Sequence, residues 1–163
     1  MKKSFVSLLL ISSLLISCVQ KNGTISNNNN GSTIKIGVYA DLTGQTSAFG
    51  QSTKNGVELA VEEINAAGGV GGKKLEILIE DDQGRPEQAK TAVSKLVNQD
   101  KVQVLIGEAT STNSLAAAPV AQEAKIPMIS HGSTNEGVTQ VGDYIFRICF
   151  IDSFQGEIGR AHV

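Results

Sequence analysis

The 163-residue sequence lacks tryptophan, and it contains only two cysteines, three prolines and 4% aromatic residues. Two cysteines, Cys18 and Cys149, are too few for a disulfide-rich scaffold. Lysine and arginine total 14 against 16 acidic residues, and they form no basic patch of the kind that nucleic-acid binding requires. His131 and His162 have no cysteine or second histidine at metal-ligand spacing. We therefore expect neither a nucleic-acid partner nor a metal site.

The N-terminus has the pattern of an export signal. Met1–Lys3 is positively charged, Phe5–Ile16 is apolar except for serines, and Cys18 follows a small residue. An apolar run of about twelve residues is shorter than the roughly twenty that a membrane-spanning helix needs. We predict a lipoprotein signal peptide over residues 1–17 and lipid attachment at Cys18. A chance cysteine after an ordinary secretory signal is the alternative.

A polar segment follows the predicted cleavage site. Residues 18–33 include four consecutive asparagines, Asn27–Asn30, and very few apolar side chains. Such a composition cannot bury enough apolar surface to fold. We expect residues 18–33 to be a lipid-attached flexible tether between the membrane and a folded domain.

Strand and helix patterns alternate from residue 34 onward. The expected strands are Ile34–Ala40, Leu75–Glu80, Val102–Ile106, Ile126–Ile129 and Tyr144–Phe150. One helix is expected from about Gly50 to Ala67 and a second from Pro86, and a third, capped by Ser111 or Thr112, is expected to run to about Lys125. This alternation predicts an α/β fold with a doubly wound, mostly parallel sheet in the order 2-1-3-4-5. The strand at Leu75 is expected at an edge because polar and apolar residues alternate there. We expect the glycines of Gly68–Gly72 to form a tight turn, since a phosphate-binding loop follows a strand and opens a helix.

Three loops are expected at the carboxyl edge of this sheet, where ligands bind in such folds. They are residues 41–49, 107–113 and 130–135, and all carry small residues and hydroxyls. The second loop opens a helix at Ser111, and free N–H groups at a helix N-terminus suit an anion. No acid, base and nucleophile converge, and Ser133 is not in a Gly-x-Ser-x-Gly elbow. We therefore predict a binding protein and not an enzyme, with a ligand carboxylate at Ser111.

We expect Cys149 and Asp82 to have structural roles and not to bind a ligand. Cys149 lies in a β-like run, so we expect a buried thiol. Asp82 precedes Pro86 and is expected to help cap the helix that begins there.

Several motifs together resemble the type I periplasmic (solute-)binding proteins. They are Lys35–Val38, Thr43-Gly44, Phe49-Gly50, Asn55–Ala60, Glu63–Asn65, Asp81-Asp82, Pro86, Gly107–Ser111, and Arg147 with Asp152–Gly156. The resemblance covers about residues 34–156, and it is strongest to the leucine/isoleucine/valine-binding proteins of branched-chain amino-acid ABC importers. It implies a two-lobe fold in which residues 34–150 form the first, ligand-binding lobe and residues 151–156 begin the hinge and second lobe.

The resemblance also implies roles for individual residues. Ser111 matches the serine that holds the ligand α-carboxylate, and Gly132 matches a position whose backbone meets the ligand. Thr134 matches a threonine that contacts the polar head, and Phe49 matches an aromatic residue that packs on the ligand side chain. No cofactor and no catalytic residue are implied.

The expected whole is an exported, lipid-anchored monomer that captures amino acids of the branched-chain type and delivers them to the membrane permease of an ABC transporter. The alternative is the ligand-sensing domain of a receptor or signalling protein. We expect the chain to be a fragment, because the resemblance implies two lobes and the sequence stops as it would enter the second. The acidic residue that relatives use for the ligand ammonium group lies in that second lobe, so the first lobe alone is expected to bind little or no ligand. Residues 157–163 fit no expected helix and match a translated sequencing adapter, which predicts a non-native tail.

Overall fold

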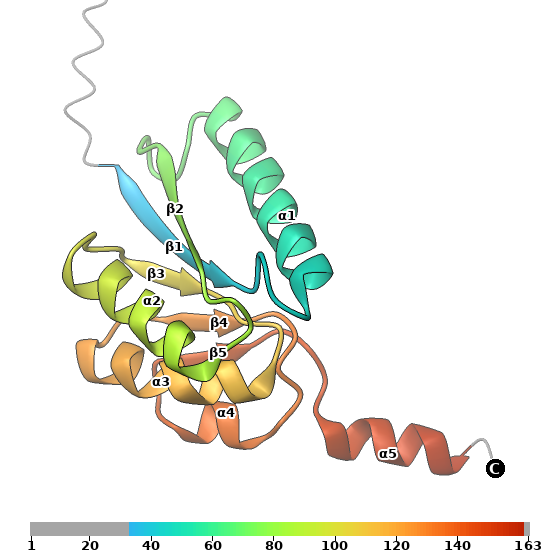
Figure 1. Cartoon of the computed structure of the whole chain (residues 1–163). Coiled ribbons are helices and arrows are strands. Elements are labelled where there is room, and N and C mark those ends of the chain that lie inside the picture. Colours follow the sequence, from blue (N-terminus) through green and yellow to red (C-terminus); the bar gives the residue numbers. More distant parts are fainter. Residues whose placement is uncertain (1–32, 162–163) are drawn as a thin grey trace, which may run out of the picture.

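The structure of the protein is a computed structural model that describes residues 33–161 (Figure 1). The elements in chain order are β1 (Ile34–Ala40), α1 (Ser47–Ala66), β2 (Leu75–Asp81), α2 (Pro86–Asn98), β3 (Val104–Ile106), α3 (Ser111–Ala124), β4 (Met128–Ser130), α4 (Gly137–Gln140), β5 (Ile145–Arg147) and α5 (Asp152–Ala161). Outside the described residues lie the predicted signal peptide, residues 18–32 of the predicted tether with Cys18, and His162.

The five strands form one parallel sheet in the order β2-β1-β3-β4-β5. Next to the edge strand β2, Ile36 of β1 pairs with Ile77 of β2 on one side and with Val104 of β3 on the other. The predicted strand order and the edge position of β2 are thereby confirmed. All five strands end at the same edge, so the loops after β1, β3 and β4 share one rim.

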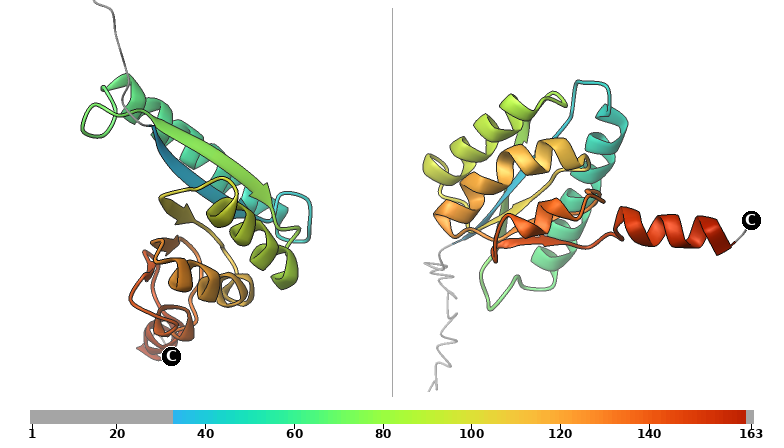
Figure 2. Two further views of the ribbon diagram at one scale, coloured as in Figure 1. Left: turned by 90° about the vertical axis from the view of Figure 1, so that its left-hand side faces the viewer. Right: turned by 90° about the horizontal axis from the view of Figure 1, so that it is seen from below.

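Alternate residues of β1 supply two separate cores. Val38 packs towards α1, where Val61 is buried, and Tyr39 packs towards α2, where Leu96 is fully buried. Successive side chains of a strand point to opposite faces, so this split places helices on both sides of the sheet. Figure 2 shows α1 on one face and α2 with α3 on the other. The doubly wound architecture predicted from the sequence is confirmed.

Several element boundaries differ from prediction for local reasons. Helix α1 begins at Ser47 rather than near Gly50, which moves Phe49 out of the expected loop and into the first helical turn. Strand β3 starts only at Val104, because the Val102 N–H donates to the Leu96 carbonyl in a turn after α2. Periodicity identifies an element but does not report such competing backbone hydrogen bonds.

Strand β4 shifts for a related reason. The Ile126 N–H donates to the Ala121 carbonyl of α3, and Pro127 has no N–H, so pairing begins at Met128. Strand β5 is also shorter than expected and ends at Arg147. Beyond it Cys149 is half-buried rather than buried, and its thiol donates to the Ser133 carbonyl at 3.3 Å.

The turn between α1 and β2 is confirmed as a tight connection. Gly69 has φ +82°, and a Cβ atom there would lie 2.0 Å from the Lys73 carbonyl oxygen. Only glycine tolerates both this left-handed backbone and this close approach. The position rules out a phosphate cradle, since the turn lies at the opposite end of the sheet from the loops after β1 and β3.

Helix α5 corrects one prediction. Residues 157–161 were expected to fit no helix, yet α5 continues through them to Ala161. The helix projects away from the sheet (Figures 1 and 2), and Phe154 is about half exposed on it. Asp152 at its start supplies an N–H that donates to the Thr134 carbonyl at 3.1 Å.

Two hydrogen-bonded carboxylates, the buried Asp41 and the half-buried Asp81, organise the rim beside β1 and β2. Asp41 accepts hydrogen bonds from the backbone and hydroxyl of Thr46, both at 2.7 Å, and Asp81 accepts from Leu42 and Thr43. Burial raises the pKa of Asp41 and of Asp81, but these hydrogen bonds outweigh it and hold each pKa below its ordinary value. The two aspartates therefore stay ionised and fix the loop that leads into α1.

Asp82 differs from its neighbours. It does not cap α2 with its side chain as predicted: the N-cap is Arg85, and one Asp82 oxygen accepts from Gly84 while the other is buried without a partner among the described residues. Burial, helped by the negative charges of Glu108 and Asp41, raises the pKa of Asp82 to about 7. Near neutral pH this carboxyl group binds a proton that the unfolded chain releases.

This assignment predicts a pH-dependent stability. A folded pKa of about 7 against an unfolded value of about 3.9 means that Asp82 stabilises the fold less and less as pH rises between those values. In Asp82→Asn this contribution disappears. We therefore expect the free energy of unfolding of wild type, relative to the variant, to fall as pH increases from 4 to 7, measured by urea unfolding with circular dichroism.

The exposed Asp143→Asn variant is the matched control and is expected to follow the wild-type curve. Parallel pH curves for wild type and Asp82→Asn would show that Asp82 is ionised in the fold throughout this range.

Candidate functional site

The three predicted loops meet at the carboxyl edge of the sheet. The loop after β1 starts at Asp41, the loop after β3 starts at Gly107, and the loop after β4 starts at His131. Adjacent parallel strands deliver their ends to one rim, which is where open α/β sheets bind ligands. Hydrogen bonds through Glu108 join these three segments, as expected of one site.

Glu108 joins all three loops. Its side chain is 1% exposed and accepts from the backbone N–H of Asp41 at 3.3 Å and of Thr110 at 2.6 Å, and from the Thr110 hydroxyl at 2.6 Å. Its carbonyl accepts from the hydroxyls of Ser130 at 2.8 Å and Ser133 at 3.1 Å. A buried carboxylate is tolerated only when hydrogen bonds replace its water. The same bonds hold the loops in one fixed arrangement.

Ser111 is the first residue of α3, whereas Thr110 is the N-cap. The prediction that Ser111 or Thr112 caps the helix is therefore wrong by one residue. The Thr110 hydroxyl is occupied by Glu108 and makes no cap hydrogen bond. The first intrahelical bond runs from Ser114 to Thr110, so the N–H groups of the first turn are available at the rim.

Ser111 lies against the loop that carries Thr134. The Asn135 N–H, next to Thr134, donates to the Ser111 hydroxyl oxygen at 3.1 Å. Since this oxygen acts as an acceptor there, its own proton is free to donate to a further group. The structure thus brings a free hydroxyl donor, a helix N-terminus and the loop after β4 together.

Gly132 lies where that loop touches the loop after β3. A Cβ atom on Gly132 would be 2.9 Å from the Ala109 carbonyl oxygen. The two backbones therefore approach closely, and a larger residue would push them apart. Gly132 keeps its own backbone groups near those of the first α3 turn.

Phe49 borders the rim from the side of α1. Its ring is 65% exposed, and the next residue, Gly50, has no room for a side chain because a Cβ atom would lie 1.8 Å from the Asp41 carbonyl oxygen. The start of α1 is thus pressed against the end of β1. The structure places Phe49 on the rim without any hydrogen bond or core contact that requires an aromatic side chain.

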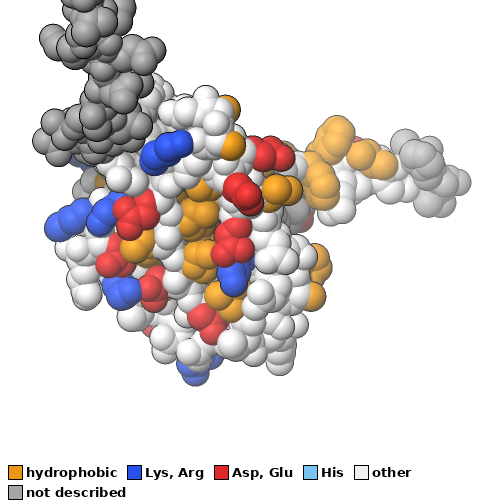
Figure 3. Space-filling model, turned by 90° about the horizontal axis from the view of Figure 1, so that it is seen from above, with side chains coloured by type: hydrophobic (Ala, Val, Ile, Leu, Met, Phe, Trp, Pro, Cys, Tyr) orange, Lys and Arg blue, Asp and Glu red, His pale blue; other side chains and the backbone are white. Residues whose placement is uncertain are grey.

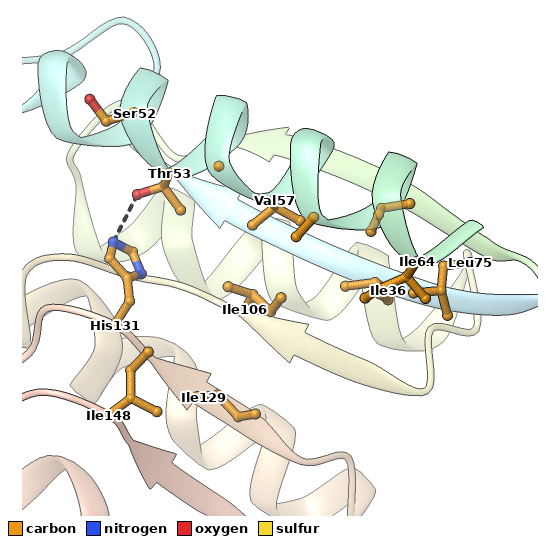
Figure 4. Close-up of a pocket in the computed structure, with 13 residues that line it drawn as sticks. Ile36, Ser52, Thr53, Val57, Ile64, Leu75, Ile106, Ile129, His131 and Ile148 are labelled. Atoms are coloured by element: carbon orange, nitrogen blue, oxygen red, sulfur yellow. Dashed lines mark hydrogen bonds between the residues drawn. The ribbon is translucent and has the colours of Figure 1, made fainter. Parts of the chain in front are cut away.

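A second feature lies beside the rim. Between α1 and the open part of the sheet is a groove of about 480 Å³ with an almost wholly apolar lining, including Val57, Ile106 and Ile129 (Figure 4). His131 closes the end of the groove next to the rim, and its Nε2 lies 2.8 Å from the Thr53 hydroxyl. Burial lowers the pKa of His131, and the charge of Glu108 acts in the opposite direction.

The loop after β4 is also held from β5. The Arg147 guanidinium donates to the carbonyls of Ser133, Asn135 and Glu136 at 3.1, 2.8 and 3.1 Å. From the sequence, Arg147 was expected only as part of a motif, and Glu108 only as a member of the loop 107–113 with no role of its own. Two signals in the sequence could have identified them: Arg147 is a charged residue inside an apolar strand, and Glu108 is an acidic residue that follows a buried strand almost directly.

The chemistry available at the rim is that of neutral hydrogen-bond donors. Among residues 33–161 no group of three or more His, Cys, Asp or Glu side chains is placed to hold a metal ion.

The charged side chains of the surface are mixed. On the face shown in Figure 3, Lys and Arg are interspersed with Asp and Glu and do not gather into one patch. Within the described part of the chain, no helix has both the length and the apolar character needed to cross a bilayer.

Comparisons with known proteins agree with this geometry. A family model described as periplasmic binding protein matches residues 33–157. An amino-acid-binding protein of Pseudomonas aeruginosa is 37% identical over 131 residues, which is 80% of this chain and 35% of the relative. The leucine-specific-binding protein of Salmonella typhimurium is 35% identical with the same two coverages.

Solved structures give the same result. The branched-chain amino-acid transporter substrate-binding protein LivJ of Streptococcus pneumoniae, in complex with isoleucine, matches with TM-score 0.78 and 41% identity over 80% of this chain and 38% of LivJ. A leucine-binding protein of Thermotoga maritima matches with TM-score 0.72 and 37% identity over 78% of this chain and 35% of its own. These relatives are named as binding proteins and not as enzymes, in agreement with the sequence-based expectation.

The chain spans little more than a third of the length of each of these relatives. Over that span the family model covers residues 33–157, and the strand order is that predicted for the type I fold. The chain therefore belongs to the periplasmic binding protein family.

Proposed function

We propose that this chain supplies the first ligand-binding lobe of an extracytoplasmic protein that captures branched-chain amino acids for an ABC importer. The observation that carries the proposal is the free hydroxyl proton of Ser111 at the N-terminus of α3, beside the loop that holds Gly132 and Thr134. Relatives named as leucine-binding proteins, and one solved with isoleucine, support this ligand class.

The ligand carboxylate would bind at Ser111. The Ser111 hydroxyl can donate to one carboxylate oxygen, and the free N–H groups of the first α3 turn can donate to the other. Each hydrogen bond to a charged group is worth about 1.5–3 kcal/mol. A site of neutral donors holds a carboxylate without a buried cation, whose desolvation is costly.

The remaining rim residues fit the other parts of an amino acid. Thr134, on the loop that Ser111 contacts, offers a hydroxyl to the polar head, while Gly132 leaves room for the ligand to reach the backbone. The exposed ring of Phe49 can pack on an aliphatic side chain. Glu108 is not available to the ammonium group, because it is buried and occupied by Asp41 and Thr110.

The engagement of Glu108 in the frame of the rim has a consequence for affinity. A micromolar complex requires about 8 kcal/mol, and association itself carries a large entropic cost. Donors from one rim alone supply too little, so the 163-residue chain should bind a free amino acid more weakly than micromolar. In a longer protein, a second lobe closing over the rim by hinge motion would supply the missing contacts.

We further propose that the protein is exported and anchored through lipid on Cys18, works as a monomer, and delivers its ligand to a membrane permease. The signal-like residues 1–17 and the membership of a periplasmic family support a site of action outside the cytoplasm. The relatives named as transporter proteins favour this role over the ligand-sensing alternative.

Titration of the chain with L-leucine, followed by NMR of backbone amides, tests the site. We expect shifts at Ser111, Gly132 and Thr134 and a dissociation constant above the micromolar range. Ser111→Ala removes a charge-assisted hydrogen bond and should weaken binding by about tenfold or more.

Ser94→Ala on α2 deletes the same hydroxyl away from the rim and serves as the control. Equal leucine affinity in both variants would remove Ser111 from the site. Micromolar binding by the wild-type chain in calorimetry would contradict the expected need for further contacts.

Lipid anchoring is tested with the two cysteines of the chain. On expression in a bacterium, the wild-type protein should fractionate with membranes and incorporate labelled fatty acid, because lipid is attached to Cys18. Cys18→Ser should lose both properties, whereas Cys149→Ser should keep them. Labelling of Cys18→Ser at the wild-type level would disprove the anchor.

A further inference from the structure

His131 connects two of the elements that form the rim. It lies at the start of the loop after β4, directly before Gly132, and its Nε2 is 2.8 Å from the hydroxyl of Thr53 on α1 (Figure 4). The same hydroxyl is 2.9 Å from the Phe49 carbonyl one turn earlier. A continuous path of hydrogen bonds therefore runs from the backbone of Phe49 to the loop that carries Gly132 and Thr134.

The hydrogen-bond pattern assigns a position to the histidine proton. The Thr53 hydroxyl donates its single proton to the Phe49 carbonyl, which can only accept. With the hydroxyl so directed, the Thr53 oxygen accepts from His131, and the proton of the neutral ring is assigned to Nε2. The other ring nitrogen, Nδ1, is left as an acceptor, and it is buried without a partner among the described residues.

The surroundings of the ring oppose a positive charge. His131 lies at one end of the apolar groove, near Ile106, Ile129 and Ile148, and it is the single titratable residue in the groove lining (Figure 4). Glu108 is the charged group whose field reaches it, and this field favours the protonated form. Burial outweighs Glu108, so the pKa of His131 lies below its ordinary value. The protonated ring could still donate from Nε2, but its second proton, on Nδ1, would be buried without an acceptor among residues 33–161, which drives the charged ring out of this position.

We propose that His131 is a positioning residue of the ligand site: as the neutral Nε2–H form it latches the loop of Gly132 and Thr134 to the first turns of α1, and acidification opens this latch. The latch sets the distance between the ring of Phe49 and the donors of the loop. Its effect on ligand binding rests on the proposed function, whereas the latch itself is a property of the ligand-free chain.

The first test needs no ligand. Ring ¹⁵N chemical shifts of His131 in the full chain should show a protonated Nε2 and an unprotonated Nδ1 at pH 7, with titration below the ordinary histidine range. A proton on Nδ1 at pH 7 would overturn the proposal, because the bond to Thr53 would then need the opposite direction.

Variants of Thr53 separate the hydrogen bond from packing. Thr53→Val keeps the shape and removes the hydroxyl, so the amide resonances of Gly132 and Thr134 should move, whereas Thr53→Ser should retain their wild-type positions. Unchanged Gly132 and Thr134 amides in Thr53→Val would overturn the latch.

His131→Gln tests the effect of pH, because it places a non-titrating N–H near the position of Nε2. Between pH 7 and 5 the loop amides of wild type should shift, and those of His131→Gln should shift much less.

Addition of L-leucine distinguishes the latch from the proposed function. If leucine binds, its affinity for wild type should fall several-fold more between pH 7 and 5 than its affinity for His131→Gln, and Thr53→Val should bind more weakly than Thr53→Ser. Equal binding by the two Thr53 variants would overturn the positioning role. If leucine shifts no amide of the wild-type chain even near its solubility limit, the proposed ligand site on this lobe fails, and the ligand-free measurements alone decide the latch.

Discussion

The arrangement of the rim depends on Glu108. One buried carboxylate accepts N–H groups from the loop after β1 and from its own loop, and the carbonyl of the same residue accepts hydroxyls from the loop after β4. Removal of a buried charge partner leaves polar groups unsatisfied at a cost of about 1–3 kcal/mol each. The loops are therefore fixed before any ligand arrives, which lowers the entropic cost of binding.

The hydrogen bonds to Glu108 determine which hydroxyl groups at the rim remain free to bind a ligand. The residues nearest the frame, such as Thr110 and Ser133, use their hydroxyls on Glu108 and have none to offer a ligand. Ser111, one residue further along, accepts from Asn135 and keeps its own proton free. In the proposed site a carboxylate is bound by groups that need no rearrangement, while the Glu108 carboxylate is engaged in structure.

The sequence predicted the larger features of the fold, because they follow from strong periodic patterns. Strand order, helix faces and the shared position of three loops were all accessible from the alternation of Ile34–Ala40 with later elements. The role of Glu108 was not, because it depends on contacts between residues such as Asp41 and Glu108 that are far apart in sequence. Phe49 was misplaced into a loop, and α5 was missed beyond residue 156, since helix ends depend on local hydrogen bonds.

Hydrogen exchange of backbone amides in Glu108→Gln tests the central role of this residue most directly. The exposed Glu123→Gln on α3 is the matched control. Our account predicts that amides of all three loops, residues 41–46, 107–110 and 131–135, exchange faster in Glu108→Gln by about tenfold or more, while those of the sheet stay protected. Faster exchange confined to residues 107–110 would contradict it, because the other two loops would then be held independently of Glu108.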